Sequence, residues 1–269
     1  MHRFFVEPNA IGDLEARIAG ETARQICRVL RMQVGDEICL LDGLGYEHRI
    51  RLVSIGANEC VGRVIERVKG RAEPRCKVTL YISLLNKADK FEWALQKCTE
   101  LGAARFVPVR STRSISDAPG HSKTERLERI NQGAAEQSGR AIIPTLEESI
   151  SLQAEFQQES AALRSAQDGE HIALIPALRA QVALKGALRG IEGAGTLAIF
   201  IGPEGGFAPS EVDEAKAAGV VPITMGPRTL RAETAAVAAL TMALYEMGEV
   251  ELLEDVGQLA EGLENEGQA

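Results

Sequence analysis

The sequence predicts an α/β protein in which a small β-rich domain precedes a domain with a parallel sheet. Two largely apolar runs, 197–201 and 220–225, each lead into a glycine-containing loop and then into a helical segment. Such runs are typical of strands buried on both faces of a parallel sheet. Strand-like and helix-like segments also alternate from Cys76 onward, whereas residues 1–73 contain short strand-like segments separated by turn signals.

The composition is that of a globular protein with two domains. A chain of 269 residues with 45% hydrophobic and 25% charged residues can bury a substantial core. No apolar run approaches the length of a membrane span, and no signal-peptide pattern opens the sequence. The five cysteines form no C-x-x-C pair, and the four histidines show no zinc-binding spacing. We therefore expect a cytoplasmic, reduced protein that binds no membrane and no metal.

Charge is distributed unevenly along the chain. The net charge of −8 divides into +1 for residues 1–75, +4 for residues 76–140 and −13 for residues 141–269. Residues 246–269 alone carry eight acidic side chains and no basic one. Acidic ends of this kind are usually solvated, so residues 249–269 are assigned as an acidic tail. The overall acidity therefore neither supports nor excludes binding to RNA.

In residues 1–73 the pattern predicts a small β-rich domain. Strands are expected at 4–6, 37–41, 46–53 and 60–68, together with a short helix at 23–30. The pair Asp42-Gly43 is a hairpin signal. The helix presents Arg24, Arg28 and Arg31, which either contact RNA phosphates or form a solvated face.

The second domain is expected at residues 74–248, after a linker at 70–75 that contains Pro74. A strand at 78–85 precedes a helix for which Asp89 and Glu92 form a capping-box pair and Gly102 marks the end. The apolar stripe of this helix consists of Phe91, Leu95, Cys98 and Leu101.

Two further strands and one helix precede the glycine loops. A strand at 105–109 leads into the basic loop 110–114, and a helix starts at Ser122, with Glu125 as its capping partner, and ends at Ser138. Another strand is expected at 171–176. Its first residue, His171, fits a strand-edge histidine better than a catalytic one.

The stretch 196–247 contains the candidate site. The first strand ends at the loop 202–207, and a short helix follows with Ser210 as its expected N-cap. The second strand ends at the loop 226–229, from which an alanine-rich helix begins. The apolar line of this last helix runs through Val237, Leu240, Leu244 and Met247. In a parallel sheet, ligands bind beyond the carboxyl ends of the strands, so both loops are expected at one site.

The loops are suited to an uncharged ring. Gly205, Gly206 and Gly226 allow the backbone to approach a ligand closely, and Pro203 and Pro227 stiffen the loops. The chain has no Walker lysine and no G-x-G-x-x-G turn, so a phosphate cradle is not indicated. Backbone amides and carbonyls could instead bond a ring edge such as that of adenine. The alternative is two tight turns with no ligand.

The two loops read I-G-P-E-G-G-F from Ile201 and M-G-P-R-T-L-R-A-E-T-A from Met225. This pair closely resembles the SPOUT-superfamily methyltransferases, and within them the bacterial 16S ribosomal RNA (uracil-N3)-methyltransferase family. The resemblance extends over H-R-F-F at residue 2, Q-K-C-T-E-L-G at residue 96 and A-E-Q-S-G-R at residue 135. The chain departs from the family pattern at Gln25, Cys98, Pro227, Thr229 and Ala232. None of these departures removes a charged residue that is a candidate for the site.

The resemblance implies a fold and partners. The first domain should be a PUA-like barrel that binds RNA, and the second should form a deep trefoil knot. The cofactor should be S-adenosylmethionine, and the substrate 16S ribosomal RNA within the small ribosomal subunit. A homodimer is also implied, with Val237, Leu240 and Leu244 either at its interface or in the core.

The resemblance also implies site residues. The cofactor should lie against Ile201, Gly202, Pro203, Glu204, Gly205, Met225, Gly226, Leu230, Arg231, Thr234 and Ala235. RNA should contact Arg24, Arg28, Arg31, Lys87, Lys97, Arg113, Arg140 and Arg228. These are expectations for the structure.

The implied reaction is methyl transfer to N3 of a uridine in the decoding region. Uracil N3 is largely protonated at neutral pH, so transfer needs a base or stabilisation of the developing anion. Arg231 is the first candidate for stabilising that anion, and Glu204 or Glu233 could accept the proton or merely cap a helix. Two alternatives stay open: methylation of a ribose 2′-hydroxyl, and a catalytically silent RNA-binding assembly factor.

Overall fold

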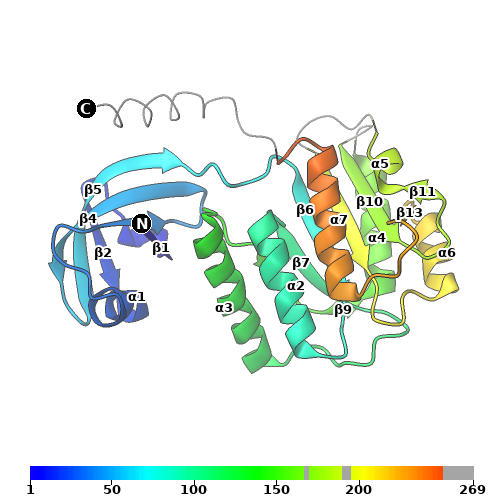
Figure 1. The fold of residues 1–269 in the computed structure, drawn as a ribbon, viewed down its shortest axis with the longest axis horizontal. Coiled ribbons are helices and arrows are strands. Elements are labelled where there is room, and N and C mark those ends of the chain that lie inside the picture. The colour runs from blue at the N-terminus through cyan, green and yellow to red at the C-terminus, as the bar shows by residue number, and fades with distance from the viewer. Residues whose placement is uncertain (167–169, 190–194, 251–269) are drawn as a thin grey trace.

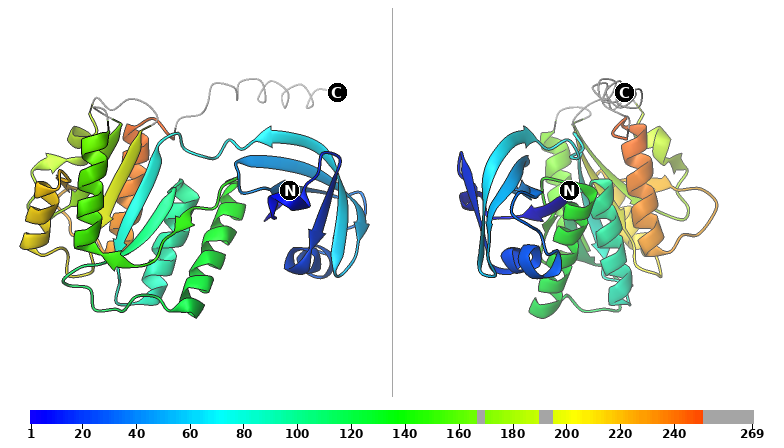
Figure 2. Two further views of the ribbon diagram at one scale, coloured as in Figure 1. Left: turned by 180° about the vertical axis from the view of Figure 1, so that it is seen from behind. Right: turned by 60° about the vertical axis from the view of Figure 1, so that its left-hand side comes forward.

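The protein has two lobes joined by one extended segment. The computed structural model describes residues 1–166, 170–189 and 195–250. A β domain at the N-terminus and a larger α/β domain lie side by side, and the chain crosses between them from β5 to β6 (Figure 1). Seen from behind and from the side, the β domain lies beside α3 (Figure 2). No helix within these ranges is long and apolar enough to cross a membrane.

The first sheet has the strand order β1-β3-β4-β5-β2. Its strands are β1 (His2–Phe5), β2 (Glu15–Ala19), β3 (Glu37–Leu41), β4 (Tyr46–Ile55) and β5 (Glu59–Lys69). A short turn η1 (Pro8–Ala10) precedes β2, and α1 (Gly20–Arg24) continues into a π-helical turn η2 (Gln25–Val29). The four predicted strands, the hairpin at Asp42-Gly43 and the predicted helix are confirmed. The strand β2 was not predicted; its burial alternates strictly, but of the two residues that face the core, Ala16 and Ile18, only Ile18 has a large apolar side chain.

The second sheet is parallel throughout the described residues. Its strand order is β11-β13-β10-β12-β6-β7-β8, and β9 pairs with β7. The strands are β6 (Lys77–Ser83), β7 (Arg105–Arg110), β8 (Thr145–Leu146), β9 (Ile150–Ser151), β10 (His171–Pro176), β11 (Val182–Ala183), β12 (Thr196–Ile201) and β13 (Val221–Thr224). Residues 197–201 of β12 are all buried, as expected for a strand covered on both faces. The predicted parallel α/β architecture is confirmed.

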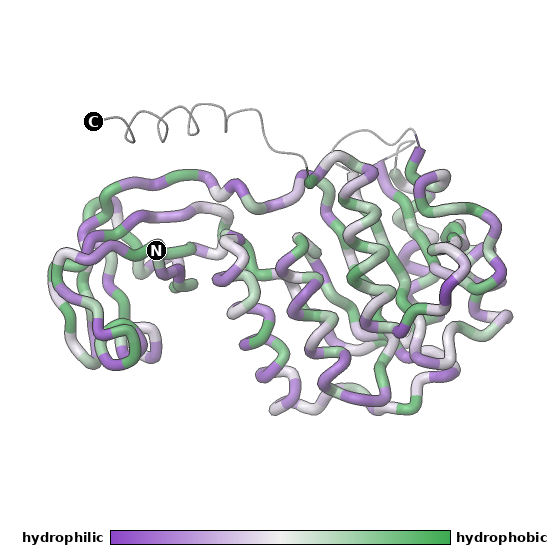
Figure 3. Tube along the Cα trace, viewed as in Figure 1, coloured by the Kyte–Doolittle hydropathy of each residue, from purple (hydrophilic) through white to green (hydrophobic). Residues whose placement is uncertain are grey.

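Helices cover both faces of this sheet (Figure 1). One face carries α2 (Ala88–Leu101), α5 (Leu184–Ala187) and α7 (Ala232–Glu246), with α3 (His121–Ser138) packed on α2, and the other carries α4 (Leu152–Ser165) and α6 (Pro209–Ala217). Hydrophobic segments gather along the strands and the inward sides of the helices (Figure 3). On α7, Leu240 and Leu244 are fully buried and Val237 packs against the same cluster. These residues therefore belong to the core of the second domain.

The predicted helix caps are wrong at three helices. The N-cap positions are Lys87 for α2, Gly120 for α3 and Ala208 for α6, and none of these side chains makes a capping bond. Proline at the first position of α6 starts that helix before the expected cap Ser210. The amide of Ala208 instead donates to Glu211 Oε2 at 2.7 Å.

His171 belongs to a half-buried network on the α4 side of the sheet. Its Nε2 lies 2.6 Å from Glu159 Oε2 and its Nδ1 lies 2.7 Å from Thr196 Oγ1. The hydroxyl of Tyr81 donates to Glu159 Oε1 at 2.6 Å. The hydrogen bond with Glu159 raises the pKa of His171. Since His171 begins β10, this network lies at the strand edge opposite the glycine loops.

Candidate active site

The site lies at the carboxyl edge of the second sheet. The strands β13, β10 and β12 are neighbours in the sheet although they are not consecutive in sequence. Their three following segments therefore meet, and the segment after β10 lies between the two glycine loops. Ligand sites in parallel sheets form at this edge.

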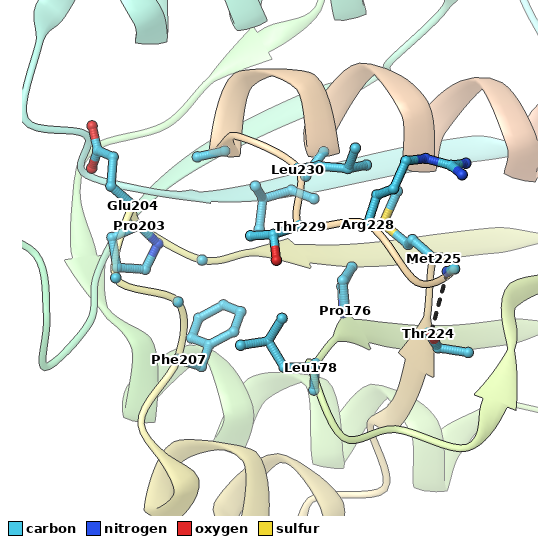
Figure 4. A pocket seen from close by; sticks show the side chains of 18 of the residues that line it. Pro176, Leu178, Pro203, Glu204, Phe207, Thr224, Met225, Arg228, Thr229 and Leu230 are labelled. Carbon is cyan, nitrogen blue, oxygen red and sulfur yellow. Dashed lines mark hydrogen bonds between the residues drawn. The ribbon is translucent and has the colours of Figure 1, made fainter.

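A cavity of about 280 Å³ opens between these loops; small-molecule sites span about 300–1,000 Å³. The side chains of Phe207, Leu178 and Pro176 surround it together with Thr229 and Leu230 (Figure 4). Its lining residues are Pro176, Ala177, Leu178, Ile201, Gly202, Pro203, Glu204, Gly205, Gly206, Phe207, Thr224, Met225, Gly226, Pro227, Arg228, Thr229, Leu230, Ala232 and Ala235. The walls are thus mainly apolar side chains and loop backbone, which suit a flat ring.

Most of the residues expected at the cofactor line this cavity. The exceptions are Arg231 and Thr234, which are exposed outside it. Sequence reasoning missed the segment 176–178 after β10. The proline that ends β10 was visible, but only the sheet order places that strand between the other two.

The backbone of the second loop is shaped by glycine. Gly226 lines the cavity and has a φ of +99°, and a Cβ at this position would meet no heavy atom within 4 Å beyond its chain neighbours. Its amide donates to Thr224 Oγ1 at 3.2 Å (Figure 4). A branched residue at this position would therefore be strained and would fill space that a ligand needs.

Glu204 is held by residues before and at the start of α2. Its carboxylate accepts hydrogen bonds from the amide of Asn86 at 3.2 Å and from Lys90 Nζ at 3.2 Å. It points away from Phe207 and Leu178 (Figure 4). Burial alone would raise the pKa of Glu204, but bonds from its own backbone, Lys90 and Asn86 together lower it. A bonded carboxylate with a low pKa is a poor proton acceptor, so the geometry argues against Glu204 as the base.

The start of α7 carries the other two catalytic candidates. Arg231 is the N-cap residue, is exposed and makes no ion pair with a described residue. Glu233 lies in the first turn, and its Oε2 is buried without a hydrogen-bond partner within the described part of the chain. Glu233 does not line the cavity, but unlike Glu204 it has a carboxylate oxygen without a hydrogen-bond partner among the described residues.

Arg113, expected at RNA, braces the first glycine loop. Its Nη1 donates to the carbonyl of Gly205 at 2.7 Å and to that of Phe207 at 3.4 Å. The neighbouring amide of Thr112 donates to Glu211 Oε1 at 2.6 Å. The loop after β7 is therefore fixed to the loop after β12.

The other residues expected at RNA fall into two groups. Arg24, Arg28, Arg31, Lys87 and Arg228 are exposed and form no ion pair with the described residues. In contrast, Lys97 pairs with Glu100 at 2.7 Å, and Arg140 is only 2% exposed. The expectation that Arg140 faces RNA does not hold in this structure, because both ends of its guanidinium are bonded inside the protein.

Comparison with known proteins assigns the family. A profile of the RNA methyltransferase domain matches residues 72–244, more than half of the chain. The chain belongs to the RNA methyltransferase family. The RNA methyltransferase PUA domain matches residues 18–65, so the PUA-like first domain is confirmed. Among the described residues of this RNA methyltransferase, no group of three or more His, Cys, Asp or Glu could hold a metal ion.

Several relatives match over nearly their whole length. The chain is 34% identical to ribosomal RNA small subunit methyltransferase E of Bacillus subtilis, over 91% of this chain and 97% of that protein. It is similar to the crystal structure of the enzyme of that name from Neisseria gonorrhoeae bound to S-adenosyl methionine, with a TM-score of 0.80, 28% identity and 91% and 97% coverage. A putative methyltransferase of Legionella pneumophila, in complex with the bound cofactor SAM, gives a TM-score of 0.77, 26% identity and 90% and 96% coverage.

Proposed function

We propose that this protein methylates N3 of a uridine in the decoding region of 16S ribosomal RNA, within the small ribosomal subunit. The observation that carries the proposal is the cavity between the two glycine loops, in a chain that matches a small-subunit RNA methyltransferase over 91% of its length. The same substrate implies a cytoplasmic protein, since bacterial ribosomes are assembled there. Nucleoside analysis of 16S RNA from a strain that lacks this protein tests the proposal.

The cavity fits S-adenosylmethionine. Its walls are loop backbone around Gly202 and Gly226 and apolar side chains such as Phe207 and Leu230, which suit an adenine ring and its edge. When bound, S-adenosylmethionine supplies a methyl group on a positively charged sulfur. The protein's own part is to orient that group toward the uracil and to exclude competing nucleophiles.

Two side chains at the start of α7 are proposed to act on the uracil. Arg231 is free of ion pairs among the described residues and stabilises the negative charge that develops as N3 loses its proton. Glu233, with a free carboxylate oxygen, accepts that proton. We assign Glu204 to positioning the first glycine loop, because Asn86 and Lys90 hold its carboxylate.

Mutation can distinguish the roles of Glu233 and Glu204. Glu233→Gln removes the proton acceptor and is expected to lower the single-turnover rate by about a hundredfold, within the usual range for a general base. Glu204→Gln should act mainly on the cofactor KM, because Glu204 ties the first glycine loop to Asn86 before α2 and to Lys90 in the first turn of α2. Equal losses of rate in both variants, with no change in cofactor KM, would contradict this division.

The N-terminal domain is proposed to hold RNA through Arg24, Arg28 and Arg31. These exposed arginines lie on and just after the α1–η2 segment. Replacing all three by alanine should weaken RNA binding and reduce the slope of log K against log salt by about two, at about 0.7 per phosphate contact to single-stranded RNA. The matched control is Arg49→Ala with Arg51→Ala, because these exposed arginines already pair with Glu37. Equal salt slopes for the two variants would contradict the assignment.

We also propose that the protein is a homodimer. A mainly apolar groove of about 620 Å³ borders Met225 and Gly226 and includes the exposed side chains of Met242 and Tyr245. A second copy covering this groove would complete the wall behind the second glycine loop. Light scattering should give twice the 28.9 kDa of one chain, and a Tyr245→Glu variant should give a single chain. A wild-type mass of one chain at micromolar concentration would contradict the proposal.

A trefoil knot is the finer topology that we propose for the second domain. The chain leaves β13 near one edge of the sheet and returns in α7 to pack against α2, β12 and β6. Single-molecule pulling on the two ends should leave a fully unfolded chain that is shorter than its contour length, because a tightened knot retains residues. An unfolded length equal to the full contour would contradict the knot.

A further inference from the structure

The segment that joins the two domains, residues 70–76, is held by contacts along its length. At its start, the amide of Gly70 donates to the carbonyl of Gly45 at 2.9 Å. A Cβ on Gly70 would lie 2.6 Å from the Cβ of Ala141, and a Cβ on Gly102 would lie 2.5 Å from Pro74 Cγ. Since no side chain fits at either glycine, the segment is packed directly against the second domain. It is therefore not a free tether.

Glu73 fixes the middle of this segment to the second domain. Its carboxylate receives two hydrogen bonds from Arg140, at 3.3 Å from Nε and 2.6 Å from Nη2, and a third from the amide of Ile142 at 3.1 Å. Arg140 Nη1 donates in turn to the carbonyls of Thr99 and Ala103 at the end of α2. A cation at a helix C-terminus is favoured by the helix dipole.

Glu249 fixes the end of the segment. It accepts hydrogen bonds from the amide of Arg75 at 2.8 Å, from Arg75 Nε at 3.2 Å and from the amide of Cys76 at 3.4 Å. Its side chain is only 4% exposed. Gly248, with a φ of +69°, turns the chain back after α7, and the amide of Glu249 bonds the carbonyl of Leu244. This is a Schellman ending, so Glu249 belongs to the folded domain and not to the acidic tail predicted from residue 249.

Direct contact between the domains is limited beside these bonds. The amide of Phe5 donates to Glu136 Oε1 at 3.1 Å. Cys39, Leu41 and Ala141 form a small buried cluster against Phe5. Further contacts join β1 to α3. The segment 70–76 therefore adds a second constraint on the relative orientation of the two domains.

We propose that Glu73 and Glu249 are positioning residues, which hold the segment 70–76 rigid and so set where RNA on the N-terminal domain meets the cofactor site. This inference rests on the proposed function, in which the N-terminal domain holds the RNA. Neither residue touches the cofactor cavity. Both should therefore act on RNA use and not on cofactor affinity.

The test compares two truncations that differ by two residues. A chain that ends at Val250 keeps Glu249, and a chain that ends at Gly248 lacks it. Hydrogen exchange of the peptide 70–76 should match the full chain in the first case. It should be at least about tenfold faster in the second, because the amides of Arg75 and Cys76 lose a charged acceptor. Glu73→Gln provides an independent variant that breaks the Arg140 pair.

Methylation gives the functional readout. For the chain ending at Gly248 and for Glu73→Gln, kcat/KM for RNA should fall by at least about tenfold, while the cofactor Kd stays within about twofold. The chain ending at Val250 should match the full chain in both. All assays are run well below the melting temperature of each variant, because a purely stabilising role would lower that temperature and leave kcat/KM unchanged.

Each contrary outcome has a distinct meaning. Unchanged exchange in the chain ending at Gly248 would show that Glu249 does not hold the segment. Faster exchange with unchanged kcat/KM would show that a rigid segment positions nothing. If the full chain itself methylates no uridine at N3, the proposed function fails. The exchange comparison then still shows whether Glu249 holds the segment 70–76.

Discussion

Replacing Arg231 by alanine is expected to slow methyl transfer by at least about a hundredfold, the lower range for removal of one electrostatic group at a reacting centre. Arg231 is the exposed N-cap of α7 and has no ion-pair partner among the described residues. A helix N-terminus is electropositive, so a cation placed there without an anion is locally disfavoured. The developing uracil anion or an RNA phosphate supplies that anion. Since Arg231 does not line the cavity, cofactor binding should be retained.

Single-turnover assays at saturating cofactor and RNA separate the two roles of Arg231. A rate that stays low at saturating RNA means stabilisation of the anion, whereas full recovery at high RNA means positioning of a phosphate. Arg231→Lys should recover little if the contact is bidentate, because an ammonium cannot reproduce the guanidinium fork. A wild-type rate for the alanine variant under both conditions would make Arg231 a structural residue.

Gly226→Val is expected to abolish cofactor binding, with at least about a hundredfold loss of affinity. The native φ of +99° is unfavourable for a branched residue, and the new side chain would project into the space at the cavity wall. Calorimetric titration of S-adenosylmethionine measures the loss directly.

The matched control for this variant is Gly35→Val in the N-terminal domain. Gly35 has a φ of +101° and likewise open space at its Cβ position, so the backbone strain is comparable but the site is remote. The control should lose stability and keep its cofactor affinity. Equal affinity in both variants would mean that the cofactor does not lie against the second glycine loop.

The sequence was a good guide to the buried central strands and a poor guide to short strands and helix starts. Buried strands such as β12 are continuous apolar runs in the sequence, and such a run is enough to predict the strand. Helix starts depend on single hydrogen bonds, and polar residues near a start compete for them. At α2, the expected cap Asp89 bonds the amide of Lys90, and its partner Glu92 bonds Arg126 on α3.

The site could be predicted in part. The two glycine loops carry their own signal, since glycine and proline end two buried strands. The third wall, 176–178, has no such signal, because its place follows from the order β13-β10-β12. Charge alone also could not separate the exposed Arg28 from the buried Arg140, since burial depends on partners that are distant in sequence, such as Glu73.

Mass spectrometry of 16S RNA nucleosides tests whether this protein methylates uracil N3. RNA is compared from a strain that lacks this protein and from the same strain with the protein or its Arg231→Ala variant restored. We expect N3-methyluridine to be absent from the deletion strain, restored by the wild-type protein and restored poorly by the variant. N3-methyluridine at normal levels in the deletion strain, or the loss of a ribose-methylated nucleoside in its place, would contradict the account.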